Sequence, residues 1–116
     1  MATEKRYKTL KEFYPYYLTE HQDPECRRMH FIGTSLFFGV LILAIVLGNG
    51  WLLLLLPVVG YGFAWYGHFR YEKNKPATFQ YPLFSLASDF IMYYDTLTGQ
   101  VERKLESAKM TIQQQG

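Results

Sequence analysis

Two long apolar stretches dominate the pattern of hydrophobic and polar positions along the chain. Residues 31–47 and residues 51–67 are runs without a charged side chain, and the turn-forming residues 48–50 (GNG) separate them. Runs of this length are at the short end of what crosses a bilayer as a helix, and adjoining residues lengthen both. The pattern therefore predicts two membrane-spanning helices joined by a tight turn.

Local signals define where these two helices begin and end. Asp23 is a favourable N-cap and Pro24 suits the first helical position, so the first helix should begin at Pro24. The second helix contains Pro57, which a membrane helix tolerates with a kink. We expect this helix to continue past the apolar run to about Asn74.

Two weaker helical signals flank the apolar runs. Residues 9–12 (TLKE) fit a capping box and predict a short helix that Pro15 should bend or end. The aromatic residues that follow suit either the headgroup zone or packing against the rest of the protein. Residues 82–97 carry apolar side chains at helical spacing, which predicts an amphipathic helix lying in the membrane interface or docked on the hairpin.

The polar face of this amphipathic helix includes Ser85, Ser88 and Asp89. We expect Asp89 to be a solvated residue of that face, and a partner for a metal-binding histidine is the alternative. From Val101 onward the sequence is polar with a thin apolar stripe, which is typical of a frayed surface helix.

These elements predict an all-α membrane protein: a transmembrane helical hairpin with a short N-terminal helix and amphipathic C-terminal helices. We expect a single membrane domain over residues 1–98 and a polar C-terminal tail over residues 99–116. A buried hairpin in a soluble protein is the alternative. It is disfavoured because so short a chain has too little other material to cover two such helices.

The charge distribution along the chain indicates the membrane orientation more clearly than it indicates a binding partner. A net charge of +2 in 116 residues gives no reason to expect a nucleic-acid partner. No Lys or Arg lies in the turn at residues 48–50, whereas six precede the first run and six follow the second. The positive-inside rule therefore predicts that both termini are cytoplasmic.

The hairpin makes a geometric prediction about two of the three histidines. His30 lies nineteen residues before Asn49, and His68 lies nineteen residues after it. At about 1.5 Å per residue each is roughly 28 Å from the turn, so the two lie at the same height. Neighbouring helix axes are only about 8–10 Å apart, so both imidazoles could reach one point at the membrane surface.

Two further residues could join this pair. Glu72 lies one turn beyond His68 on the same helical face, and His21 lies just before the first long helix. His21, His30, His68 and Glu72 would then form a cluster of three histidines and one carboxylate. Such ligands suit Fe(II), Mn(II) or Zn(II), and mixed nitrogen and oxygen sites with open positions suit non-haem iron.

Other interpretations of these residues remain open. A histidine at a membrane boundary is often a polar residue in the headgroup layer, and Glu72 could simply pair with a neighbouring Arg or Lys. The equal height of His30 and His68 also permits haem ligation, although no haem-attachment motif is present.

Three stretches carry a resemblance to a known family: residues 13–18 (FYPYYL) with His21, residues 29–34 (MHFIGT) and residues 65–77 (WYGHFRYEKNKPA). They resemble a small family of membrane proteins, formerly a domain of unknown function, found in bacteria and fungi. Its fungal members are ER-resident, Fe(II)-dependent 2-hydroxy fatty acid dioxygenases of lipid alpha-oxidation. They shorten their substrate by one carbon.

The resemblance implies Fe(II) as cofactor and assigns roles to particular residues. His21, His30 and His68 match family histidines, which implies that they are catalytic metal ligands, and Glu72 matches the acidic residue after the last of them. It also implies a 2-hydroxy fatty acid or membrane lipid and O₂ as partners. Because only two spans are predicted, self-association into a homo-oligomer would help to enclose such a site. The alternative is a non-enzymatic small membrane protein that binds metal, lipid or a partner subunit.

This chain departs from the fungal members in two respects. They are longer, with more hydrophobic segments, so the chain looks like the short bacterial branch. This likeness implies a bacterial inner membrane, or the ER if the chain is eukaryotic. They also carry an additional histidine beside the first, where this sequence has Glu20 and Gln22.

Overall fold

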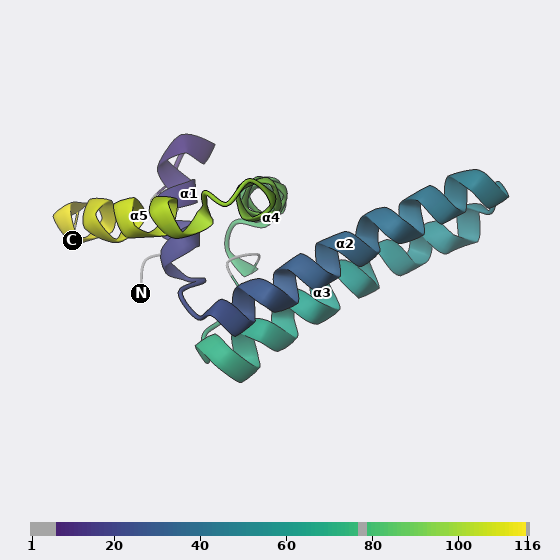
Figure 1. The fold of residues 1–116 in the computed structure, drawn as a ribbon, viewed down its shortest axis with the longest axis horizontal. Coiled ribbons are helices and arrows are strands. Elements are labelled where there is room, and N and C mark those ends of the chain that lie inside the picture. The colour runs from purple at the N-terminus through teal and green to yellow at the C-terminus, as the bar shows by residue number, and fades with distance from the viewer. Residues whose placement is uncertain (1–6, 77–78, 116) are drawn as a thin grey trace. The chain divides into compact units, whose positions relative to one another are not determined.

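The computed structural model describes residues 7–76 and 79–115, and within these ranges every regular element is helical. The all-α class is thereby confirmed. The chain divides into two compact units, which Figure 1 shows and which we describe separately. The hairpin unit comprises residues 23–75. The three-helix unit comprises the described residues before and after it.

The hairpin unit contains four consecutive helical segments. They are α2 (Pro24–Leu47), the 3₁₀ segment η1 (Gly50–Leu54), α3 (Leu55–Gly67) and the π-helical segment η2 (His68–Glu72). Helix α2 begins as predicted: Asp23 is its N-cap, and its carboxylate accepts a hydrogen bond from the Glu25 amide. At the other end Gly48 adopts a left-handed conformation, which closes the helix and turns the chain back.

Glycines allow α2 and α3 to pack closely and antiparallel. A Cβ added to Gly33 would lie 3.0 Å from the Phe63 Cβ and 3.1 Å from the Val59 carbonyl oxygen. A Cβ added to Gly67 would lie 3.1 Å from the Met29 Cβ and 3.2 Å from both the carbonyl oxygen and the sulfur of Cys26. The start of α2 therefore lies beside the end of α3 (Figure 1).

The second long helix differs from the prediction in its details. Pro57 lies in the first turn of α3, just after the 3₁₀ segment, where its missing N–H removes no bond of the α-helix. The helical stretch ends at Glu72, two residues before the expected Asn74. There Lys73 takes the left-handed backbone conformation with φ 59°. The last turn is π-helical rather than α-helical, which the apolar pattern does not indicate.

Two helical stretches of the hairpin unit are long and apolar enough to cross a membrane: Pro24–Leu47 and Gly50–Glu72. Of the most apolar window of each, only 22% and 17% is buried within the structure. Their large apolar side chains are therefore mostly exposed, including Ile45, Val46 and Trp51 near the turn.

The three-helix unit consists of α1 (Leu10–Thr19), α4 (Pro82–Leu97) and α5 (Val101–Gln115). The predicted cap of α1 is present: the Thr9 hydroxyl accepts a hydrogen bond from the Glu12 amide. Pro15 does not end this helix, which continues to Thr19. A proline within a helix removes one backbone hydrogen bond, and the burial of the residues after Pro15 offsets that loss.

Helix α1 supplies the centre of the core of this unit. Phe13, Tyr17 and Leu18 are buried, so the aromatic run serves in packing. The expectation of a frayed surface helix after Val101 is wrong, because α5 runs to Gln115 and buries one face in the same core. The residues of α5 that do so are Val101, Leu105 and Ala108.

Helix α4 has the predicted bounds, but its buried face is the polar one. Ser85, Ser88 and Asp95 are buried, whereas Leu83 and Leu97 on the apolar face are exposed. Tyrosines of α1 explain this inversion, because they give the acidic side chains of α4 hydrogen-bond donors.

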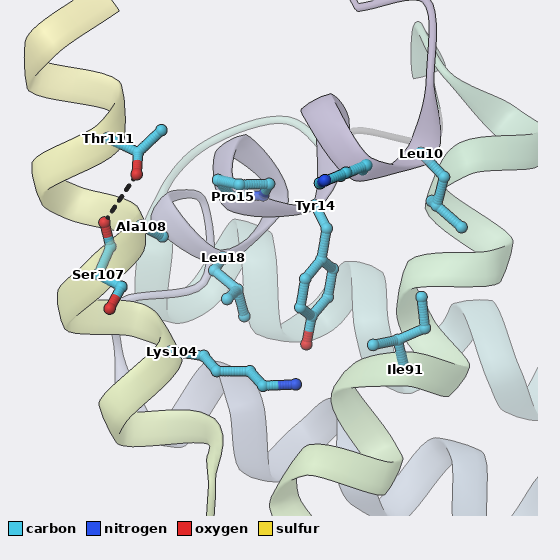
Figure 2. Close-up of a pocket in the computed structure, with 10 residues that line it drawn as sticks. Leu10, Tyr14, Pro15, Leu18, Ile91, Lys104, Ser107, Ala108 and Thr111 are labelled. Atoms are coloured by element: carbon cyan, nitrogen blue, oxygen red, sulfur yellow. Dashed lines mark hydrogen bonds between the residues drawn. The ribbon is translucent and has the colours of Figure 1, made fainter.

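One such donor is Tyr14, which lies beside a groove of about 480 Å³ between the three helices. The Asp95 carboxylate accepts hydrogen bonds from the Tyr14 hydroxyl at 2.7 Å and from the Lys104 amine at 2.9 Å. Figure 2 shows these two donors approaching the same end of the groove. Burial and the Asp95 carboxylate raise the pKa of Tyr14 above its ordinary 10.0, which keeps the phenol protonated as a donor.

Candidate metal centre

The three histidines of the chain are all buried. His30 and His68 belong to the hairpin unit. His21 belongs to the three-helix unit, where it follows the end of α1. Buried imidazoles are uncommon enough to need a structural or chemical explanation.

The prediction that His30 and His68 meet at equal height is confirmed. Their ring centroids are 4.9 Å apart, and the ring planes are nearly perpendicular at 87°. His30 is 5% exposed and His68 is 2% exposed, so this pair is shielded from solvent. Gly67 directly precedes His68, and Cys26 lies one helical turn before His30. The close approach of α2 and α3 at these two residues brings the imidazole rings together.

Each histidine makes the same type of hydrogen bond through Nδ1. The Nδ1 of His30 lies 2.9 Å from the Cys26 carbonyl oxygen, one helical turn before it. The Nδ1 of His68 lies 2.7 Å from the side-chain oxygen of Asn74. The Nδ1 of His21 lies 2.6 Å from the Tyr17 carbonyl oxygen.

These three contacts determine the tautomer of each imidazole. Carbonyl and amide oxygens only accept hydrogen bonds, so each Nδ1 must carry the proton and donate it. In the neutral ring the lone pair that can bind a cation is then on Nε2. A hydrogen bond from the second ring nitrogen to a carbonyl is the usual arrangement around metal-bound histidine, because it holds the ring and makes the ligand more basic.

The carboxylate of Glu72 has a different neighbour. It accepts a hydrogen bond from the backbone N–H of Asp23, which joins the end of η2 to the beginning of α2. Its role as a metal ligand stays a prediction, whereas its contact with Asp23 closes the end of the hairpin unit where His30 and His68 lie.

Comparison with known proteins identifies the family of the chain. A family model described as 2-hydroxy-palmitic acid dioxygenase Mpo1-like matches residues 7–101. The chain belongs to the Mpo1-like family. The match includes the three histidines, the whole hairpin unit, α1 and α4, and it ends at the first residue of α5. No curated protein and no solved structure shows a significant match to the chain.

Sequence reasoning missed two residues of the centre in this member of the Mpo1-like family. Asn74 lies six positions after His68, a spacing that does not place two side chains on one face of an α-helix. Only the π-helical turn and the left-handed Lys73 bring the Asn74 amide back to the imidazole. Nothing in the sequence signals such a turn.

The second missed residue is Tyr17, whose ring stacks on the His21 ring at 4.0 Å between centroids. Here a signal was present, because the two residues are four positions apart, the spacing of side-chain neighbours along an α-helix. The aromatic run around Tyr17 instead indicated a place in the headgroup zone or in packing.

Proposed function

We propose that this chain is a membrane-bound, iron-dependent dioxygenase that shortens 2-hydroxy fatty acids by one carbon. The observation that carries the proposal is the shared hydrogen-bond pattern of the three histidines. Each donates from Nδ1 to an oxygen, which prepares Nε2 as a metal ligand. Neutral imidazoles suit divalent first-row metals, and the family description supports iron among them.

The covalent chain supports His21 as the third ligand. His21 lies two residues before Asp23, so its Cα is within about 7 Å of the residue that opens α2. The backbone of Asp23 is in turn bound to Glu72 at the end of η2. Chain connectivity thus allows His21 to reach a metal ion held by His30 and His68.

The exposed apolar surface of α2 and α3 supports a membrane location. A core helix of a soluble protein would be mostly buried, whereas most of each apolar window here is not. If both helices span the bilayer, their antiparallel packing puts residues 23 and 75 on one side, with the metal centre at that boundary. The positive-inside rule, applied to the flanking Lys and Arg residues, puts this side and both termini in the cytoplasm.

The reaction follows from the substrate class that the family description names. One O₂ converts R–CHOH–COOH to R–COOH, CO₂ and H₂O, and the substrate supplies all four electrons, so no further reductant is needed. A bound Fe(II) would supply Lewis acidity and the means to use O₂. The chain's own part is to hold that ion through its histidines and to exclude water by their burial. Arg70, Lys73 and Lys75, just after His68, would attract the substrate carboxylate.

Haem ligation by His30 and His68 loses support. A haem held between two histidines needs its porphyrin plane between the imidazoles. The two rings instead contact each other edge to face, with centroids 4.9 Å apart, which leaves no space for a porphyrin. A non-enzymatic metal or lipid binder is the other outcome that the following experiment separates from the enzyme.

The test uses the full chain, purified in detergent and loaded with Fe(II) under anaerobic conditions. We expect about one iron per chain, and its loss in His30→Ala and in His68→Ala. On addition of O₂, 2-hydroxypalmitic acid should yield the fifteen-carbon acid, detected by mass spectrometry, whereas palmitic acid should be unchanged. Arg28→Ala, which removes an exposed side chain near His30, should retain both iron and activity.

Two results would count against the proposal in different ways. A wild-type chain that retains no iron would exclude the metal centre itself. Iron retained without conversion of the 2-hydroxy acid would favour the non-enzymatic metal-binding protein.

A further inference from the structure

Tyr17 connects His21 to a carboxylate on a different helix. Its ring stacks on the His21 ring with centroids 4.0 Å apart and planes inclined by 27°. Its carbonyl oxygen accepts a hydrogen bond from His21 Nδ1, with 2.6 Å between oxygen and nitrogen. Its hydroxyl donates a hydrogen bond to the carboxylate of Asp89 on α4. Tyr17 and His21 are each 1% exposed, so the contacts between them are shielded from water.

These contacts fix His21 from two directions. The backbone contact sets which nitrogen carries the proton, and the stacked phenol restricts rotation of the imidazole about its side-chain bonds. The hydrogen bond to Asp89 restricts the phenol in turn, because rotation of Tyr17 would break this bond between a buried hydroxyl and a part-buried carboxylate. His21 needs this support, because it follows the end of α1 and has no helix of its own to hold it.

We propose that Tyr17, anchored by Asp89, is a positioning residue that holds the imidazole of His21 in its metal-binding orientation. The inference rests on the proposed function through the role of His21 as a ligand. It extends that function by making a helix outside the hairpin unit part of the metal centre's support. The hydrogen bond between Tyr17 and Asp89 then contributes to metal affinity as well as to packing.

Tyr14 provides a matched control for Tyr17. Both tyrosines lie on α1, and each donates a hydrogen bond from its hydroxyl to an Asp on α4. The partner of Tyr14 is Asp95, which lies nearly two helical turns after Asp89. Removing either hydroxyl removes the same kind of bond from the same pair of helices, but only Tyr17 contacts a histidine.

The experiment measures Co(II) binding by the full chain in detergent, because Co(II) reports its ligands through visible absorption. Tyr17→Phe should weaken Co(II) binding about tenfold, in line with other residues that support metal ligands, and shift the Co(II) absorption band. Tyr14→Phe should leave both unchanged. Asp89→Asn, whose amide oxygen still accepts the phenol proton, should bind Co(II) nearly as the wild type does. Asp89→Leu should match Tyr17→Phe.

The outcomes distinguish this inference from the proposed function. Wild-type Co(II) binding with equal affinity and an unchanged spectrum in Tyr17→Phe would overturn the positioning role alone. Equal weakening in Tyr17→Phe and Tyr14→Phe would overturn it as well, because the effect would then be one of general stability. A wild-type chain that binds no Co(II) would overturn the proposed metal centre and, with it, the role of Tyr17.

Discussion

The imidazole of His30 contacts that of His68 edge to face, with ring centroids 4.9 Å apart, although the two residues lie in different helices. This contact depends on how closely α2 and α3 approach at Gly67. It also depends on the orientation of each ring, which hydrogen bonds to Cys26 and Asn74 determine. The spacing of the two imidazole rings and the orientation of each ring can be changed by separate substitutions.

The first prediction concerns spacing. Gly67→Val should impair metal binding strongly, because even its first added carbon would lie 3.1–3.2 Å from Met29 and Cys26, partly from backbone that cannot move cheaply. The larger residue should therefore separate the two histidines. Gly62→Ala, where an added Cβ meets nothing within 4 Å, should bind metal normally and favour the helix by up to about 1 kcal/mol. Metal analysis of both purified variants checks this expectation, and equal retention of metal would contradict it.

The second prediction concerns orientation. Asn74→Ala removes the acceptor for His68 Nδ1 and should weaken metal binding by about 10–100-fold. Asn74→Asp retains an acceptor and should keep most of the affinity. Asn49→Ala is the control, because Asn49 also makes a structural hydrogen bond, to the Trp51 amide at the opposite end of the hairpin unit. Titration with Fe(II) or Co(II) measures the affinities, and similar losses in both alanine variants would disprove an orienting role.

The third prediction concerns pH. Burial raises the pKa of Asp89 to about 7, and the hydrogen bond from Tyr17 limits the rise. The folded state therefore binds a proton that the unfolded state, with an ordinary Asp pKa of 3.8, has released above about pH 4. The resulting contribution to stability is full below pH 4 and is lost as the pH rises towards 7. The loss is up to about 1.4 kcal/mol per pH unit.

Asp89→Asn cannot titrate, so it isolates this contribution. Thermal unfolding of both proteins in detergent between pH 4 and pH 8 should show the wild type losing stability relative to Asp89→Asn as the pH rises. A constant difference between the two across this range would refute the raised pKa.

The fourth prediction concerns the ion pair of the three-helix unit. Asp95 is fully buried, and its carboxylate accepts hydrogen bonds from Lys104 and Tyr14. Lys104→Met should lower the free energy of unfolding by about 1–3 kcal/mol, because it leaves a buried carboxylate with less compensation. Lys109→Met breaks a more exposed pair with Glu106 on the same helix and should change stability by less than about 0.5 kcal/mol. Denaturant titrations of both variants would reveal whether the difference exists.

The sequence predicted those features that depend on regular helix geometry. A fixed rise per residue and a turn at Gly48 were enough to place His30 and His68 at equal height. The signals at Thr9 and Asp23 located two helix starts because a capping side chain acts on backbone groups only two or three residues away.

Features that depend on the partner of a helix were not predictable in this way. The pattern of α4 shows that it has two faces, but which face is buried depends on Tyr14 and Tyr17 of α1, which supply donors to Asp95 and Asp89. The contact between Asn74 and His68 depends on a change of helix type, which propensities for single residues do not encode. The contacts that support the histidines were therefore less predictable than the meeting of His30 and His68.

The π-helical turn after His68 makes chain length itself a constraint on this region. Such a turn holds one residue more than the corresponding stretch of α-helix. Deleting one residue between His68 and Asn74 would let an ordinary turn form and would remove the geometry that brings the Asn74 amide to the His68 imidazole. The stretch should thus accept many changes of side chain at its exposed positions but neither an insertion nor a deletion.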